Sequence, residues 1–159
     1  MSEKALTTCL WFDGNAEEAA NFYTGIFADS RIEMVNRYSE AGPGDAGQVQ
    51  LVAFELNGQK FWALNAGPQF TFNESVSFVV PCADQAEVDY YWDHLVDGGK
   101  ENVCGWLKDR FGVSWQIVPN VFFDMVNDPD REKAARVTQA MFQMTKFDIP
   151  ALQRAYAGD

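Results

Sequence analysis

Apolar residues recur at helical spacing in two parts of the chain, and each part begins with a capping sequence. After Asn15-Ala16-Glu17-Glu18, apolar residues occupy every third or fourth position up to Phe27. After Asp84-Gln85-Ala86-Glu87, the same spacing runs to Leu95, and Gly98-Gly99 follows as a stop signal. A polar N-cap followed three residues later by glutamate is a capping box, so the pattern predicts two amphipathic helices.

Short strand-like segments surround each predicted helix. Residues 7–12 precede the first helix, and residues 31–38, 48–56 and 60–65 follow it. Residues 75–80 precede the second helix, and residues 101–104, 105–108 and 113–118 follow it. The order strand, helix, strand, strand, strand therefore occurs twice. Such internal repetition is a signal about the whole fold.

Two further observations complete the predicted organisation. Residues 60–64 (KFWAL) resemble residues 113–117 (VSWQI) with matched tryptophans, as expected for a duplicated unit. The glycine-rich segment 41–47 predicts a hairpin loop, since it has neither a GxGxxG spacing nor a Walker lysine.

The remainder of the chain predicts a helical tail. Asp128-Pro129 suits a helix start and predicts a helix over residues 128–145, and Ile149-Pro150 begins another over residues 150–157. We therefore predict an α+β fold with two βαβββ modules, residues 5–70 and 71–120. With the C-terminal helices of residues 121–159, they form a single domain over residues 1–159.

Composition excludes several function classes. The 159 residues carry 12 Lys and Arg against 23 Asp and Glu, a net charge of −11, which repels nucleic acid and anionic membranes. No apolar run reaches the roughly 20 residues of a membrane span, and no signal-peptide pattern is seen, so we expect a cytoplasmic protein. Cys9, Cys82 and Cys104 form no CxxC pair, and His94 is the only histidine, which argues against disulfides and against a multi-histidine metal site.

Several stretches resemble the PhnB-like branch of the glyoxalase/bleomycin resistance/dioxygenase superfamily, also called the vicinal oxygen chelate superfamily. They are residues 9–19 (CLWFDGNAEEA), 22–23, 64–68 (LNAGP) and 104–116 (CGWLKDRFGVSWQ), and the tail after Asn120 is similar as well. The resemblance implies a glyoxalase-like curved sheet made from the two modules, and a homodimer.

Proteins of this branch are often labelled as a 3-demethylubiquinone-9 3-methyltransferase domain. Methyl transfer needs S-adenosylmethionine, usually held by a glycine-rich turn after the first strand of a parallel sheet. The sequence contains no such turn, so we expect no cofactor.

Metal-using members of the superfamily hold one divalent ion with four residues from the first and last strands of each module. Carried over to this chain, the resemblance places these positions at Thr8, Ala63, Ser75 and Gln116. Neutral side chains of this kind cannot compete with water for a divalent ion, so we expect no metal.

Strand alternation then suggests what lies on the concave face of the sheet. We expect it to bind a small molecule of unknown identity through a wall of aromatic and neutral polar residues. The pocket candidates are Thr8, Leu10, Phe12, Phe61, Asn65, Ser75, Ser77, Trp106, Ser114 and Gln116. The alternative is a sheet interior filled by its own side chains, and Trp106 suits either a pocket or an interface.

Other chemistry-bearing residues have structural explanations. His94 suits a helix surface, Asp109 and Arg110 suit a tight turn, and Glu55 suits a strand end or an interface, although it is the best lone carboxylate. The sequence thus predicts a metal-free, small-molecule-binding protein and leaves open whether it is an enzyme. The alternatives are a metal-dependent lyase or dioxygenase of the same superfamily, the methyltransferase of the family label, and a structural or interaction protein.

Overall fold

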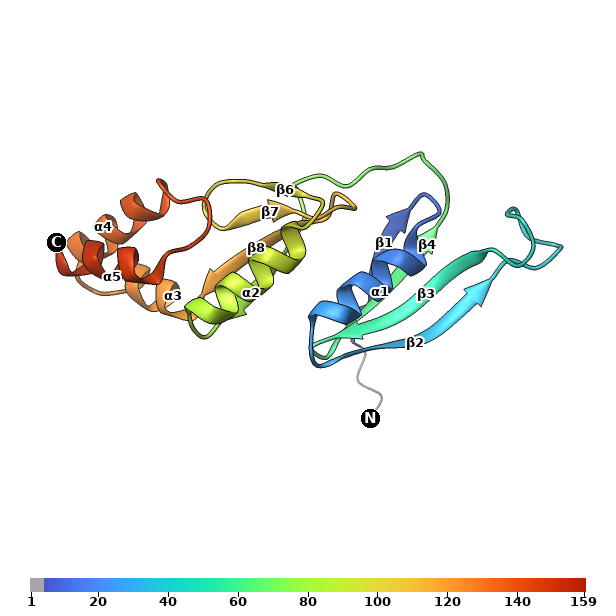
Figure 1. The fold of residues 1–159 in the computed structure, drawn as a ribbon, viewed down its shortest axis with the longest axis horizontal. Coiled ribbons are helices and arrows are strands. Elements are labelled where there is room, and N and C mark those ends of the chain that lie inside the picture. Colours follow the sequence, from blue (N-terminus) through green and yellow to red (C-terminus); the bar gives the residue numbers. More distant parts are fainter. Residues whose placement is uncertain (1–4) are drawn as a thin grey trace. The chain divides into compact units, whose positions relative to one another are not determined.

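The computed structural model describes residues 5–159, which form two compact units (Figure 1). The first unit ends at Phe72, and the second comprises Asn73–Asp159. Each unit contains one four-stranded mixed sheet with a helix on one face, and the second also carries the helical tail. The prediction of an α+β fold with two βαβββ modules and a helical tail is confirmed. That the modules make a single domain stays a prediction.

The first unit follows the predicted order. Its elements are β1 (Thr8–Phe12), α1 (Ala16–Ile26), β2 (Ser30–Arg37), β3 (Val49–Leu56) and β4 (Gln59–Asn65). The strand order is β1-β4-β3-β2, and only β1 and β4 are parallel. The glycine-rich segment between β2 and β3 is a hairpin loop, as its composition predicts.

The second unit repeats this arrangement and then continues into helices. Its elements are β5 (Ser77–Cys82), α2 (Gln85–Val96), β6 (Lys100–Glu101), β7 (Trp106–Lys108), β8 (Ser114–Pro119), α3 (Asn120–Val126), α4 (Arg131–Met141) and α5 (Ile149–Ala157). The strand order is β5-β8-β7-β6, with β5 parallel to β8. The strand predicted at residues 75–80 therefore begins two residues later, and Ser75 lies in a turn.

The two helix starts differ from each other. At α2 the Asp84 carboxylate accepts a hydrogen bond from Glu87 N at 3.0 Å, as a capping box requires. At α1 the Asn15 side chain makes no capping bond, so the predicted box is wrong there. Asn65, at the end of β4, caps α1 instead, because its Oδ1 accepts from Ala16 N at 3.0 Å.

The tail contains three helices rather than the two predicted. The short helix α3 follows β8 directly and was not expected. The helix predicted over residues 128–145 covers only Arg131–Met141, and Asp130 rather than Asp128 caps it, accepting from Glu132 N and Lys133 N. Asp128 accepts instead from the Tyr156 hydroxyl of α5 and is therefore used in packing between helices.

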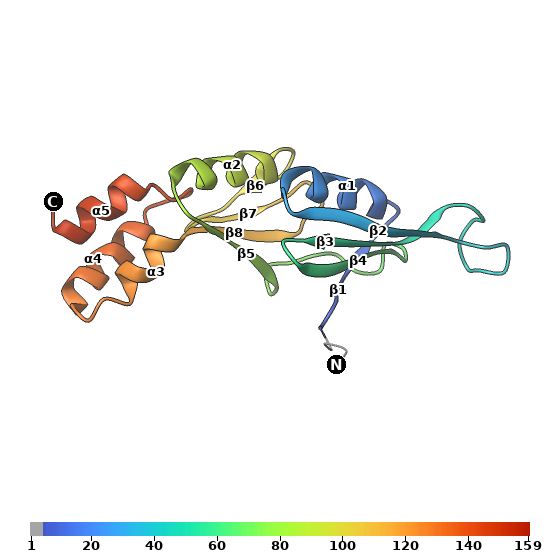
Figure 2. The ribbon, with the colours of Figure 1, turned by 90° about the horizontal axis from the view of Figure 1, so that it is seen from below.

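Helix α1 covers one face of the first sheet, and helix α2 covers one face of the second (Figure 2). In the first unit, Tyr23 of α1 stacks on Phe54 of β3, which stacks on Phe61 of β4 with ring centroids 5.2 Å apart. In the second unit, Trp92 of α2 is buried and donates from Nε1 to the Glu101 carboxylate at 3.1 Å. These contacts define a covered face and an open face of each sheet.

Among the described residues, no helix is long and apolar enough to cross a membrane.

Candidate functional site

The open face of the second sheet carries four of the expected pocket residues. Because paired residues in neighbouring strands share a face, Ser77, Ser114 and Gln116 lie together with Trp106 on the side away from α2. The opposite face carries buried side chains, including Trp115 at 3% exposed. The alternation read from β5 and β8 therefore gives the correct orientation of both strands.

A cavity of about 550 Å³ lies on this open face, between the strands and the helical tail of the same unit. The strands and their loops contribute one group of lining residues: Glu74, Val79, Asn102, Val103, Cys104, Trp106, Gln116 and Val118. The tail contributes the other group, which sequence reasoning missed: Phe122, Phe123, Met141, Phe142 and Phe147. This volume is in the range of small-molecule sites.

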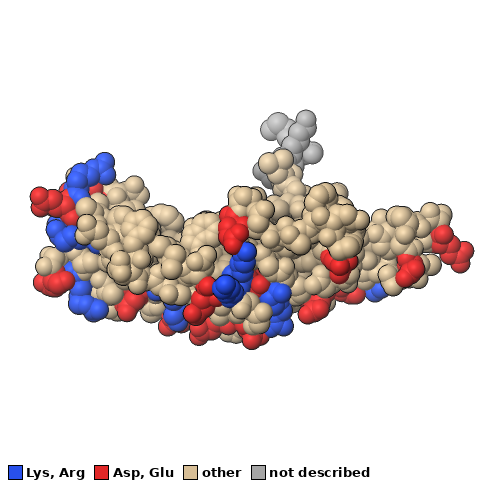
Figure 3. Space-filling view, turned by 90° about the horizontal axis from the view of Figure 1, so that it is seen from above, with Lys and Arg blue, Asp and Glu red and all other residues tan. Residues whose placement is uncertain are grey.

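Apolar side chains that water can reach gather around this cavity. Phe142 is 63% exposed, Phe123 43%, Val79 49% and Val103 57%, and all four line it. Isolated exposed apolar residues need no explanation, but a cluster around one concavity is typical of a binding site. In the space-filling view of Figure 3, uncharged side chains make up most of the visible surface.

Two side-chain amides line the cavity. Gln116 donates from Nε2 to Ser77 Oγ at 2.9 Å, and Asn102 Oδ1 accepts from Val103 N at 2.8 Å. Among the described residues, Gln116 Oε1 and Asn102 Nδ2 have no hydrogen-bond partner. These two amides therefore offer the cavity one acceptor and one donor.

The cavity has a single charged lining residue, and that charge is compensated. Glu74 forms an ion pair with Lys108 of β7. The hydrogen bond from Lys108 lowers the pKa of the Glu74 carboxyl, which is therefore ionised at neutral pH. The site thus presents no unpaired charge to a ligand.

Ser114 occupies the same face but is closed off from solvent. It is 1% exposed, and its Oγ is the one buried side-chain polar atom without a hydrogen-bond partner among the described residues. A buried unsatisfied hydroxyl costs about 1–3 kcal/mol. Ser77 and Lys108, its register partners on either side, flank it.

The candidates from the first module do not lie on the open face. Thr8, Leu10, Phe12, Phe61 and Asn65 all lie on the face covered by α1. The expected orientation of β1 and β4 is therefore wrong. Leu10, Phe12 and Phe61 are buried core residues, and Asn65 caps α1.

The open face of the first sheet carries a different set of residues. Cys9 and Trp11 of β1 pair there with Trp62 and Leu64 of β4, and Trp62 is 47% exposed. Matching Trp62 to Trp115 by sequence gave the wrong orientation for β4. Trp62 lies on the open face of its sheet, whereas Trp115 lies on the face covered by a helix.

The four positions at which the resemblance would place metal ligands do not fit a metal here. Thr8 and Ala63 lie on the face covered by α1, and the Ser75 hydroxyl, in a turn outside β5, is hydrogen-bonded to Asn73. Gln116 alone lies on an open face with an oxygen available. The described residues also contain no group of three or more His, Cys, Asp or Glu side chains that could hold an ion.

The remaining candidates have structural roles. Glu55 forms an ion pair with Arg31 at 2.9 Å, and exposed His94 donates from Nδ1 to the Tyr90 carbonyl oxygen at 2.7 Å. Asp109 is buried in the turn between β7 and β8, as its sequence position predicts.

The cysteines differ in exposure. Cys82 is buried, and burial, followed by the nearby carboxylates of Glu87 and Asp84, raises the pKa of its thiol to about 12. Burial also raises the pKa of Cys9, which is more exposed. Neither thiol is activated as a nucleophile.

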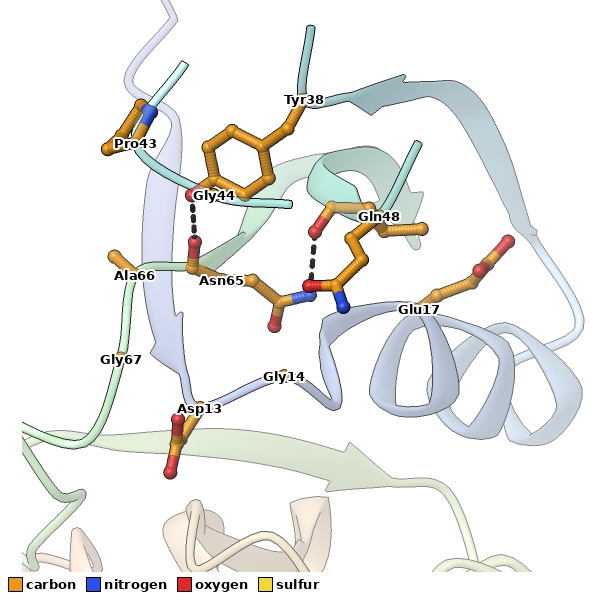
Figure 4. Close-up of a pocket in the computed structure, with 11 residues that line it drawn as sticks. Asp13, Gly14, Glu17, Tyr38, Pro43, Gly44, Gln48, Asn65, Ala66 and Gly67 are labelled. Atoms are coloured by element: carbon orange, nitrogen blue, oxygen red, sulfur yellow. Dashed lines mark hydrogen bonds between the residues drawn. The ribbon is translucent and has the colours of Figure 1, made fainter. Parts of the chain in front are cut away.

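A second cavity of about 620 Å³ lies in the first unit, where β1 ends and α1 begins (Figure 4). Tyr38 Oη donates to Asn65 O at 2.7 Å, and Asn65 Nδ2 donates to Val49 O at 3.0 Å. The Glu17 carboxylate lies 3.7 Å from Arg37. These polar groups are used in holding the long hairpin loop, so the cavity of the second unit is the better candidate site.

Comparison with known proteins agrees with this architecture. A model of the 3-demethylubiquinone-9 3-methyltransferase family matches residues 4–118. A PhnB protein from Bacillus cereus, which carries the same family name, is 39% identical, with a TM-score of 0.66 over 72% of this chain and 98% of that chain. Among curated proteins there is no significant match.

More distant structures share the fold. PA1353 from Pseudomonas aeruginosa is 19% identical, with a TM-score of 0.60 over 72% of this chain and 96% of that chain. The fosfomycin resistance protein FosX from Mesorhizobium loti is 14% identical, with a TM-score of 0.52 over 74% of this chain and 92% of that chain.

The paired βαβββ units and these matches define a glyoxalase-like protein of the glyoxalase/bleomycin resistance superfamily. Within it, the chain belongs to the 3-demethylubiquinone-9 3-methyltransferase family and is PhnB-like. The fold does not fit the methyl transfer of that name. In the described residues, parallel pairing is limited to β1–β4 and β5–β8, so there is no open parallel sheet to hold S-adenosylmethionine in the usual way.

Proposed function

We propose that this protein binds an uncharged small organic molecule in the cavity on the open face of its second sheet. The observation that carries the proposal is the cluster of four exposed apolar side chains around one cavity of about 550 Å³. Burial of apolar surface supplies roughly 25 cal/mol per Å², so such a cluster favours ligand occupancy.

The polar groups that line the cavity favour an uncharged ligand. Gln116 Oε1 accepts a hydrogen bond, Asn102 Nδ2 donates one, and the Glu74 charge is balanced by Lys108. The net charge of −11 disfavours anions in general. A molecule with one hydroxyl or N–H group on an apolar frame matches these features.

The proposal is tested with 2-naphthol as a probe, titrated into the full chain by isothermal calorimetry. Val79 lines the cavity and Val76 does not, although both are exposed on the same segment. Val79→Arg fills the cavity and is expected to weaken binding more than tenfold, whereas Val76→Arg leaves it unchanged. Failure of the wild-type chain to bind, or equal effects of the two variants, contradicts the proposal.

A further inference from the structure

The wall of the cavity opposite the strands comes from the helical tail. Phe122 and Phe123 belong to α3, and Phe142 follows α4. The family model matches residues 4–118, so all of these residues lie beyond the matched stretch.

The tail is fixed to the sheet through its backbone. Cys104 N donates to Met144 O and Gly105 N donates to Thr145 O, each at 2.8 Å. These bonds hold the segment after Phe142 against the loop that precedes β7. A side chain at position 105 would meet the ring of Phe147, because a Cβ built there lies 2.4 Å from it.

Helix α2 holds the same segment from another direction. Gln85 Nε2 donates to Phe147 O at 3.0 Å, and Gln85 Oε1 accepts from Ile149 N at 2.8 Å. Lys146 forms an ion pair with Asp89 at 2.8 Å. The spacing between the tail and the sheet is therefore set by direct bonds on both sides of Phe147.

The aromatic residues of the tail divide into two kinds. Phe147 is 2% exposed and packs against Phe122 with ring centroids 4.9 Å apart, so it anchors the tail. Phe123 is 43% exposed and Phe142 63%, and both rings line the cavity. Phe123 also contacts the edge of the Phe122 ring, with centroids 6.0 Å apart. Exposed rings on a fixed wall can stack against a ligand without a large loss of conformational entropy.

We propose that Phe123 and Phe142 determine ligand specificity, selecting a flat aromatic ring that is held between the tail and the strand residues Val79 and Trp106. This inference rests on the proposed function and narrows its ligand class. The ligand is an uncharged, planar aromatic compound whose ring substituent donates a hydrogen bond to Gln116. Saturated compounds of the same size lose the stacking contact.

The test compares 2-naphthol with its saturated analogue, decahydro-2-naphthol, by calorimetry on the full chain. Phe123→Leu and Phe142→Leu keep an apolar side chain and remove the ring. Together they are expected to weaken 2-naphthol binding about tenfold, as loss of aromatic contacts predicts, and to leave the analogue unaffected. Phe70→Leu, a change at an exposed ring outside the cavity, serves as the matched control and is expected to alter neither affinity.

The outcomes separate the two proposals. If the double variant still prefers 2-naphthol to the analogue as strongly as wild type does, the tail does not set specificity, although the cavity binds. If wild type binds both compounds equally well, the specificity inference is again overturned. If neither compound binds wild type, the proposed function itself fails, and the inference fails with it.

Discussion

Trp115 Nε1 donates a hydrogen bond of 2.8 Å to the Asp109 carboxylate, and both residues are buried. The second carboxylate oxygen of Asp109 accepts from the backbone N–H groups of Phe111 and Val113 at 2.9 and 3.0 Å. A single side chain therefore closes the turn between β7 and β8 and fixes the indole under α2.

Asp109→Asn is expected to lower the free energy of unfolding by about 2–4 kcal/mol, because an amide nitrogen replaces an acceptor facing N–H donors. Urea denaturation followed by tryptophan emission measures the change. Asp97→Asn, which removes only an exposed partner of Arg110, is the control and should cost less than about 1 kcal/mol. Equal effects of the two variants would show that the turn does not depend on Asp109.

Ser114→Ala is expected to raise the free energy of unfolding by about 1 kcal/mol, since it removes a buried hydroxyl without a partner. Ser77→Ala is the comparison, because its hydroxyl does accept a hydrogen bond from Gln116. Thermal denaturation of both variants distinguishes them. A lower melting temperature for Ser114→Ala would mean that the hydroxyl has a bonding role.

Acid should release the segment that carries Lys146. The hydrogen bond from Lys146 lowers the pKa of Asp89, and the hydrogen bond from Tyr156 lowers the pKa of Asp128. A carboxyl with a lowered folded-state pKa stabilises the fold above the ordinary aspartate pKa, and this contribution is lost as pH falls through the folded-state value.

Hydrogen exchange at the Cys104 and Gly105 amides, which donate to Met144 O and Thr145 O, reports on this release when pH is lowered below the ordinary range of aspartate. After correction for intrinsic rates, protection there is expected to fall before protection in β8. Asp89→Asn should remove much of that pH dependence and slightly lower the protection at neutral pH, because the ion pair with Lys146 is then absent at every pH. An unchanged dependence in this variant would exclude Asp89 as the group responsible.

Metal ions are expected to leave the stability of the protein unchanged. An ion that binds only the native state raises the melting temperature by mass action. Added Zn²⁺, Ni²⁺ or Mn²⁺, and chelators, should therefore not shift the melting temperature. Elemental analysis after dialysis is the direct measurement, and one equivalent of metal that is lost in Gln116→Ala would restore a metalloenzyme interpretation.

We expect a homodimer. The outer strands of each sheet pair on one side only, and Trp62 on the open face of the first sheet is 47% exposed. Sedimentation at micromolar concentration is expected to give a species near twice the chain mass of 17.9 kDa. A monomer alone at that concentration contradicts this expectation.

The sequence predicts the strand and helix order well because capping residues, glycines and alternation are local signals. It also orients β5 and β8, where serines and glutamine alternate with large apolar residues. It fails for β1 and β4, whose residues are apolar on both faces, so that alternation gives no direction there. The wall of the cavity was also missed, since Phe123 and Phe142 come close to Trp106 only through tertiary packing of the tail.

The bond between Asn65 and Ala16 links the first turn of α1 to a residue 49 positions further along the chain. An isolated helix of 11 residues is marginal in water, and α1 has no capping side chain of its own. Its first turn is therefore completed only after β4 has paired with β1. The first unit should accordingly form in a single cooperative step, late helix and long-range sheet together, rather than by growth from a preformed helix.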